Sequence, residues 1–93
     1  GLGIRTINAN TSLTIDDHTV IIVNTVGAAA IAITLPAANT CARREYVVVN
    51  QNVTTSKTFS VNYLDFTGTA VNTIPGTGSI TIQSNGTNWY RIR

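Results

Sequence analysis

Apolar and polar residues alternate along most of this chain with a period of two. In residues 79–84 the alternation places Ile80 and Ile82 on one face. Similar segments recur upstream at intervals of roughly ten residues, and this period is typical of strands with one buried face. The chain is therefore predicted to be all-β, with short strands at residues 4–7, 12–15, 19–24, 30–35, 45–50, 58–63, 79–84 and 88–93.

The last two predicted strands meet across Asn85-Gly86. This dipeptide suits the positive φ angles of a tight hairpin turn, so we expect the chain to finish as a β-hairpin. Trp89 and Tyr90 should then point to opposite faces of the last strand, one of them into the core. Other turns are expected at residues 16–17, 26–27 and 54–57, and longer loops at residues 36–44 and 64–78.

Helices are not expected. The sixteen Thr and ten Asn, with Val and Ile supplying most apolar side chains, favour strands and turns, because β-branched residues lose χ1 freedom in a helix. Residues 27–33 are rich in alanine, yet their alternation continues directly into Pro36. The predicted fold is a small antiparallel sandwich or barrel of short strands.

Two segments, residues 20–23 and 46–49, are apolar on both faces. One face of such a strand can pack on the chain's own core, and the other needs a cover. A neighbouring subunit is one such cover, and a sandwich with unusually buried central strands is the alternative. On the first interpretation the trimer interface is predicted at Val20, Ile22, Ile31 and Ile33.

Charged residues are scarce, at 11% of the chain against 43% hydrophobic residues, which also favours self-association. The net charge is +2, and the basic residues cluster only at Arg43-Arg44 and at Arg91 with Arg93. A nucleic-acid binder usually has a denser basic face with aromatic residues, so no nucleic acid is expected as a partner. The two clusters fit either solvated surface charge or capture of an anion.

The remaining composition points to one domain, residues 1–93, taken from a longer protein. The chain opens on Gly1 and contains no Met, so residues 1–10 are expected to join an upstream stalk. Cys41 is single, which excludes an internal disulfide. No apolar run approaches the roughly 20 residues that span a bilayer, and no signal peptide is visible, so membrane insertion is not expected.

Four motifs occur in an informative order. They are Thr-Ile-Asp-Asp-His-Thr-Val-Ile-Ile-Val at residues 14–23, Ile-Thr-Leu-Pro-Ala-Ala at 33–38, Arg-Glu-Tyr-Val-Val-Val-Asn at 44–50 and Ser-Asn-Gly-Thr-Asn-Trp-Tyr at 84–90. In this order the chain, from about Ser12 to Arg93, resembles the C-terminal β domain of trimeric phage tail-fibre-like proteins and related bacterial trimeric fibre adhesins.

The resemblance implies an intertwined or closely packed homotrimer at a fibre tip, extracellular, on a bacterial cell surface or a phage virion. It implies that the tip engages a cell-surface ligand, most simply a glycan. A structural clamp that only trimerises the stalk is the alternative. The chain departs from the pattern at Arg43, where a Gly usually stands, and at Pro75, where an acidic residue is common. If the first position needs a positive φ, Arg43 is strained.

Catalytic chemistry is not expected. A triad at His18 would need a nucleophile, and nothing marks one. Asp16, Asp17 and His18 diverge on a turn and are not expected to bind a metal. Glu45 and Asp65 could form an acid pair of a glycosidase only if packing brought them together. No cofactor is expected.

Binding groups tend to lie on loops held by a rigid sheet, here residues 39–44 and 62–69. Sugar rings stack on aromatic faces, while charged side chains bind their hydroxyl groups. The predicted ligand-binding residues are Arg43, Arg44, Tyr63 and Asp65. Most of the aromatic residues are expected in the core.

Overall fold

The computed structural model describes residues 3–53 and 56–93 and is all-β. Its strands are β1 (Gly3–Ile7), β2 (Thr11–Ser12), β3 (Asp17–Ile22), β4 (Ile31–Thr34), β5 (Glu45–Asn50), β6 (Lys57–Leu64), β7 (Ala70–Thr73), β8 (Gly78–Ser84) and β9 (Trp89–Arg91). Two short 3₁₀ segments, η1 (Asn24–Val26) and η2 (Ala38–Thr40), connect β3 to β4 and β4 to β5.

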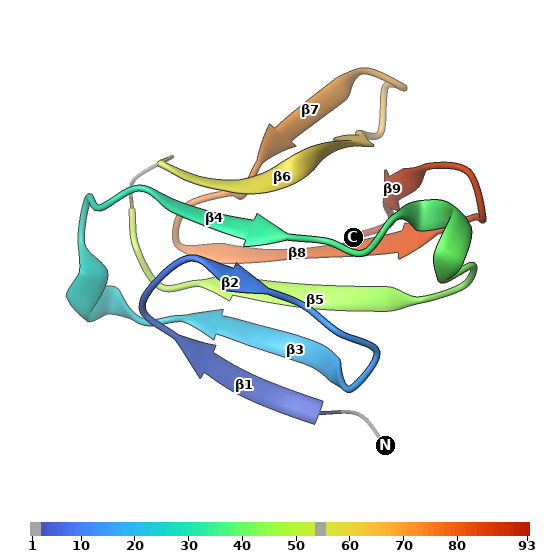
Figure 1. Ribbon diagram of the computed structural model, residues 1–93. Coiled ribbons are helices and arrows are strands. Elements are labelled where there is room, and N and C mark those ends of the chain that lie inside the picture. Colours follow the sequence, from blue (N-terminus) through green and yellow to red (C-terminus); the bar gives the residue numbers. More distant parts are fainter. Residues whose placement is uncertain (1–2, 54–55) are drawn as a thin grey trace.

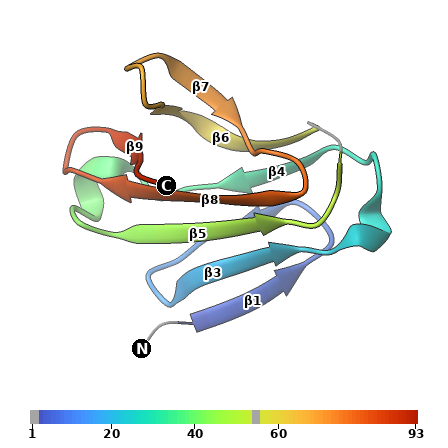
Figure 2. The same cartoon turned by 180° about the vertical axis from the view of Figure 1, so that it is seen from behind.

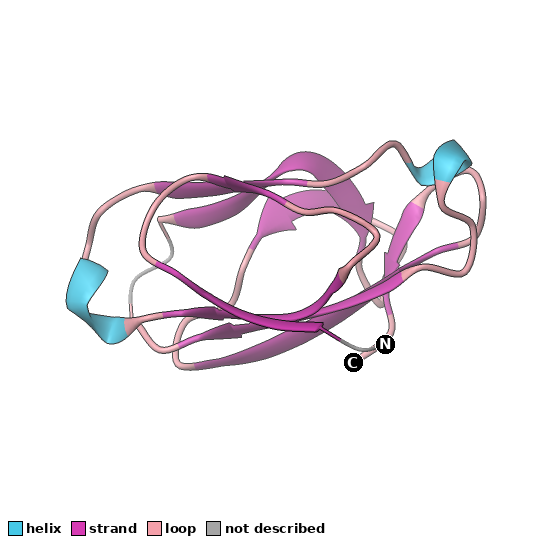
Figure 3. Ribbon diagram, turned by 60° about the horizontal axis from the view of Figure 1, so that its bottom comes forward, coloured by secondary structure: helices cyan, strands magenta, loops and turns pink. Residues whose placement is uncertain are grey.

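The strands form one sheet that folds back on itself into two layers (Figure 1). Its order is β1-β3-β5-β8-β9-β6-β4-β2, with β7 paired to β6. One layer holds β1, β3, β5 and β8, which Figure 2 shows from behind the view of Figure 1. The other layer holds β2, β4 and β6, and β9 joins the two layers along one side. The result is a flattened, nearly closed barrel (Figure 3).

The predicted antiparallel arrangement is wrong for most of the sheet. Among the pairings of the described strands, five are parallel and three are antiparallel. From β1 to β6 the chain alternates between the layers, so that β1, β3 and β5 run in the same direction, as do β2, β4 and β6. Antiparallel pairs occur only where β8 returns beside β5 and in the hairpins β6–β7 and β8–β9.

The core lies between the two layers. It consists of side chains at most 6% exposed, namely Ile7, Leu13, Val20, Ile22, Ile31, Ile33, Leu35, Tyr46, Val48, Phe59, Tyr63, Ile74, Ile80, Ile82 and Trp89. The four residues predicted at a trimer interface, Val20, Ile22, Ile31 and Ile33, are 0–3% exposed in the single chain. They have no free surface to offer a second copy, so this assignment is corrected to core packing.

The strand predictions are confirmed at β5 to the residue and elsewhere within two or three residues, apart from β7. The predicted loop at 64–78 contains this strand.

The terminal hairpin is present, but its loop runs over residues 85–88. Only Gly86 of the Asn-Gly pair has a positive φ, 93°. The Asn85 Oδ1 accepts hydrogen bonds from the backbone N–H groups of Thr87 and Asn88, at 3.0 and 2.9 Å. Residues 54–55 of the turn predicted at 54–57 lie outside the described residues.

In the two segments predicted to be apolar on both faces, residues 20–23 and 46–49, successive side chains do lie on opposite faces of the sheet. Val20, Ile22, Tyr46 and Val48 are buried in the core. The alternate side chains of β3 and β5 lie on the outer surface of their layer and are half-buried. We call the outward side of β1, β3, β5 and β8 the outer face. It contains two cross-strand rows, Ile4-Thr19-Val47-Thr81 and Thr6-Ile21-Val49-Ser79.

Candidate functional site

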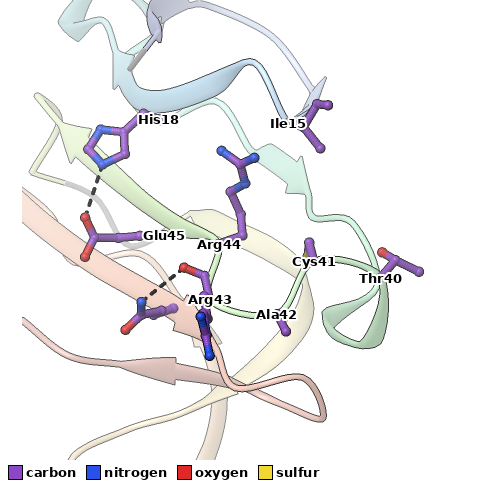
Figure 4. A pocket seen from close by; sticks show the side chains of 9 residues that line it. Ile15, His18, Thr40, Cys41, Ala42, Arg43, Arg44 and Glu45 are labelled. Carbon is purple, nitrogen blue, oxygen red and sulfur yellow. Dashed lines mark hydrogen bonds and ion pairs between the residues drawn. The ribbon is translucent and has the colours of Figure 1, made fainter. Parts of the chain in front are cut away.

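A depression of about 540 Å³ opens where β5 begins (Figure 4). Its lining comes from the β2–β3 turn, the start of β3, the segment between η2 and β5, the start of β5 and the end of β8. The lining residues are Ile15, His18, Thr40, Cys41, Ala42, Arg43, Arg44, Glu45 and Gln83.

The β2–β3 turn is fixed by an internal network. The Asp17 Oδ2 accepts the Thr14 N–H at 2.9 Å and pairs with the Arg5 guanidinium at 3.1 Å. The Tyr46 hydroxyl donates to the Thr14 carbonyl oxygen at 2.8 Å. These bonds hold Ile15, which is 66% exposed, at the rim of the depression.

Arg43 has a φ of 73°, which confirms that its position needs a left-handed backbone. The Arg43 N–H donates to the Ser84 carbonyl oxygen at 2.8 Å, and the Arg43 carbonyl oxygen accepts the Gln83 side-chain amide at 3.1 Å. Both bonds tie this strained residue to the end of β8. Strained non-glycine residues persist where the surroundings over-determine them, and they cluster at binding sites.

His18 faces the depression because β3 is bulged at its start. The pairing register advances from Gly3 opposite Asp17 to Ile4 opposite Thr19, so His18 is the extra residue. Its Nε2 lies 3.1 Å from the Glu45 Oε2, and its Nδ1 lies 3.1 Å from the Thr19 hydroxyl. The other Glu45 oxygen is 3.6 Å from Arg93. The one carboxylate of the depression is therefore engaged on both oxygens.

Most basic side chains of the chain have protein partners. Arg5 pairs with Asp17, Arg93 pairs with Glu45, Arg91 stacks on Phe66 and donates to a carbonyl oxygen, and Lys57 is buried against carbonyl oxygens. Within residues 3–53 and 56–93, the guanidinium groups of Arg43 and Arg44 donate no hydrogen bond to the protein and form no ion pair. Arg44 extends between His18 and Ile15, while Arg43 points the other way (Figure 4).

Two of the four predicted ligand residues are elsewhere. Tyr63 is 3% exposed, and its hydroxyl donates to the Thr73 carbonyl oxygen at 2.5 Å. Burial raises the pKa of this hydroxyl, which the positive charge of Arg91 partly offsets. Asp65 lies in the β6–β7 turn and does not line the depression. The structure thus places Arg43 and Arg44 in the lining of one depression, with side chains that point in different directions, and separates them from Tyr63 and Asp65.

The Asp65 carboxylate organises its own turn. Its Oδ1 accepts the Thr67 hydroxyl at 2.7 Å, the Thr67 N–H at 2.8 Å and the Thr69 N–H at 3.0 Å. These hydrogen bonds, led by the Thr67 hydroxyl, lower the pKa of Asp65. Asp65 therefore stabilises the turn of the β6–β7 hairpin.

The sequence interpretation missed His18, Glu45 and Gln83 as neighbours of the two arginines. His18 was weighed only for catalysis and metal binding and Glu45 only for catalysis, and the two are 27 positions apart. Their proximity follows from the parallel β3–β5 pairing, and that of Glu45 and Gln83 from the β5–β8 register. Alternation alone does not reveal either register.

Across the described part of the chain, no three His, Cys, Asp or Glu side chains gather closely enough to hold an ion. The Cys41 thiol donates to the Ala37 carbonyl oxygen at 3.3 Å.

A second, smaller depression of about 230 Å³ lies beside the β8–β9 loop. Pro36, Val61, Asn62, Asn88 and Trp89 are among its lining residues. The Trp89 indole N–H donates to the Pro36 carbonyl oxygen at 3.2 Å, and the side chain is 2% exposed. Trp89 therefore presents no open ring face for stacking.

Compared with family models, curated proteins and solved structures, the chain shows no significant match. No helix in the described residues is long and apolar enough to cross a membrane.

Proposed function

We propose that this chain is the adhesion module of an extracellular fibre tip, which self-associates as a homotrimer and engages a cell-surface glycan. The proposal rests on β5, because this strand contributes both to the outer face and to the depression. Val47 and Val49 of this strand lie in the two uncharged, half-apolar rows of the outer face. Glu45, at its start, borders the depression that contains two arginines without protein partners.

Self-association is supported by the outer face. The first row alternates isoleucine or valine with threonine, and the second places Ile21 beside Val49 between Thr6 and Ser79. Neither row contains a charged residue. Ile4, in the first row, is 71% exposed. Contiguous exposed apolar side chains on a protein surface are characteristic of interaction sites. The number of copies, three, comes from the resemblance alone.

Adhesion is supported by the depression at the rim of the same layer. Three copies around one axis would present three equivalent depressions, and simultaneous binding would raise apparent affinity without a strong single contact. The loops that form the depression are held by hydrogen bonds to β8 and by the β2–β3 turn network. Such pre-organised loops bind with little loss of conformational entropy.

A glycan array probed with the labelled protein tests the adhesion function. The wild-type protein should retain a subset of glycans, and the double variant Arg43→Ala/Arg44→Ala should lose them. Arg91→Ala removes the same kind of charge from a side chain that stacks on Phe66, and it should bind as the wild type does.

Sedimentation of the same samples separates the two candidate functions. A trimeric mass with glycan binding supports the proposal. A trimeric mass with no binding to any array would overturn the adhesion function in favour of a structural clamp, and a single-chain mass would overturn the trimer.

A further inference from the structure

We infer that the depression at the start of β5 is a subsite for the carboxylate of an acidic sugar, with Arg44 as the group that binds it. This inference rests on the proposed adhesion function and names its ligand class. It follows from the charges around the depression, from the shape of its lining and from the hydrogen-bonding capacity left on its side chains.

The charges favour an anion. Arg44 extends between His18 and Ile15, while Arg43 points the other way, and the one carboxylate of the lining, Glu45, is already contacted by His18 and Arg93. Arg44 is half-buried with no carboxylate partner of its own. A guanidinium group presents paired N–H donors that match a carboxylate in a bidentate arrangement. A ligand carboxylate therefore matches the donors that Arg44 leaves unused.

The lining suits a sugar ring better than a small inorganic ion. A volume of about 540 Å³ falls within the range of small-molecule sites, about 300–1,000 Å³. Ile15 offers an exposed aliphatic side chain to the C–H face of a ring. The Gln83 amide donates one hydrogen bond to the Arg43 carbonyl oxygen and keeps its own carbonyl oxygen for a hydroxyl. The Thr40 hydroxyl donates to Ala37 and can still accept a hydrogen bond.

A nucleic-acid phosphate is a poorer fit. Single-stranded nucleic acid binds on exposed aromatic side chains beside a basic groove, and the depression has no aromatic residue other than His18 in its lining. Glu45 at the depression would also repel a backbone with successive phosphates. A single carboxylate on an otherwise neutral, hydroxyl-rich ligand satisfies both observations.

Amide chemical-shift titration of the whole chain tests the inference with a matched pair of sugars, methyl β-D-glucuronide and methyl β-D-glucoside. They differ only in the carboxylate. The glucuronide should shift the amides of residues 40–45 and 83 in a saturable way at millimolar concentration, which is typical of a single weak subsite. The glucoside should bind at least tenfold more weakly. Sodium sulfate at matched ionic strength should cause no saturable change in these amide chemical shifts.

Variants assign the effect to Arg44. Arg44→Gln should weaken glucuronide binding at least tenfold, and Arg44→Lys, which keeps the charge but loses the bidentate donors, should weaken it severalfold. Arg91→Gln should bind as the wild type does. A dispersed amide spectrum establishes that each variant is folded.

Several results would overturn the inference. They are equal binding of glucoside and glucuronide, saturable binding of sulfate at the same amides with equal affinity, an unchanged affinity in Arg44→Gln, or no shift at residues 40–45. If the glycan array shows binding of neutral glycans alone, the adhesion function stands and the acidic-sugar inference fails.

Discussion

Arg43 shows how one backbone angle determines the geometry of the depression. A non-glycine residue in the left-handed region costs about 1–2 kcal/mol. At φ 73° Arg43 bears that cost while two hydrogen bonds to β8 hold it in place. Only glycine adopts this angle freely, but glycine also loses more conformational entropy on folding.

This strain predicts an order of stability for substitutions at residue 43. Arg43→Gly should leave the free energy of unfolding unchanged or raise it by up to about 1 kcal/mol, because relief of strain and loss of entropy nearly offset each other. Arg43→Val should be about 1–2 kcal/mol less stable than the glycine variant, because a β-branched residue tolerates positive φ poorly. Urea unfolding followed by Trp89 fluorescence measures both. A valine variant as stable as the glycine variant would contradict the left-handed geometry.

Lys57 is a buried charged residue whose ammonium group bonds to neighbouring backbone and side-chain oxygens. It is 0% exposed, and its ammonium group donates to the carbonyl oxygens of Gly27 and Ala29 and to the Ser56 hydroxyl. These contacts hold the chain between η1 and β4 against the start of β6. The Lys57 ammonium group therefore connects the two segments through several hydrogen bonds.

Lys57→Met should lower the free energy of unfolding by about 2–4 kcal/mol, because a side chain of similar length loses the charged donor of the hydrogen bonds to the Gly27 and Ala29 carbonyl oxygens. Arg44→Met is the control, since the Arg44 guanidinium forms no hydrogen bond or ion pair with the described residues, and it should change stability by less than about 0.5 kcal/mol. Both values come from urea unfolding at one protein concentration. Equal stabilities for the two variants would show that the Lys57 contacts contribute nothing net.

Single residues differ in how far the sequence predicts them. The strain at Arg43 could be expected, because the resemblance places a glycine there. The burial of Lys57 could not, because lysine is almost never fully buried and its partners are carbonyl oxygens, which every residue has. Tyr63 and Asp65 were predicted to bind ligand since they have suitable chemistry. In the structure their polar groups form hydrogen bonds within the chain instead.

At the scale of elements, the β6–β7 hairpin depends on one ionised group. The Asp65 carboxylate accepts three hydrogen bonds within its turn, and its pKa lies below the ordinary value. A carboxyl group whose pKa is lower in the folded state adds stability above the unfolded-state pKa, which is about 3.9 for Asp. That contribution disappears as the pH falls through the lower, folded-state pKa.

Asp65→Asn isolates this charge, because all three bonds go to Oδ1 and an amide oxygen can accept them as well. The wild-type protein should be more stable than the variant at pH 7, and the difference should shrink below about pH 4. Urea unfolding at a series of pH values measures it. Asp16→Asn, an exposed carboxylate that accepts no hydrogen bond from the described residues, is the control. A difference between wild type and Asp65→Asn that is constant with pH would contradict the assignment.

The elements also show what alternation can and cannot predict. The side chains of β5 alternate strictly between buried and half-buried, and the sequence predicted this strand to the residue. Alternation specifies which side chains share a face, but it does not specify which strand lies alongside, or in which direction. The parallel pairings were therefore missed. β7 was missed because Ala70–Thr73 is short and mostly exposed, with no apolar alternation.

At the scale of the whole molecule, one layer has apolar side chains both on its buried side and, at Ile21, Val47 and Val49, on its outer face. The single chain covers the buried side completely, with Val20 at 0% exposure. It leaves Ile21, the next residue, only half-buried on the outer face. Val20 therefore contributes to folding of the single chain, whereas Ile21 is available for association of several chains. The sequence pattern alone does not distinguish these two roles.

If the outer face is covered by further copies, the melting temperature of the wild-type protein should rise with protein concentration, because association stabilises the folded state by mass action. Ile21→Lys should remove that dependence and give a folded single chain, since the lysine points outward and its ammonium group would be desolvated only in the assembly. Val20→Lys should instead fail to fold at any concentration, because an unpaired charge in the core costs several kcal/mol. Circular dichroism melts with sedimentation of the same samples distinguish the three proteins. A wild-type melting temperature that is independent of concentration, together with a single-chain mass, would show that this face stays open to solvent.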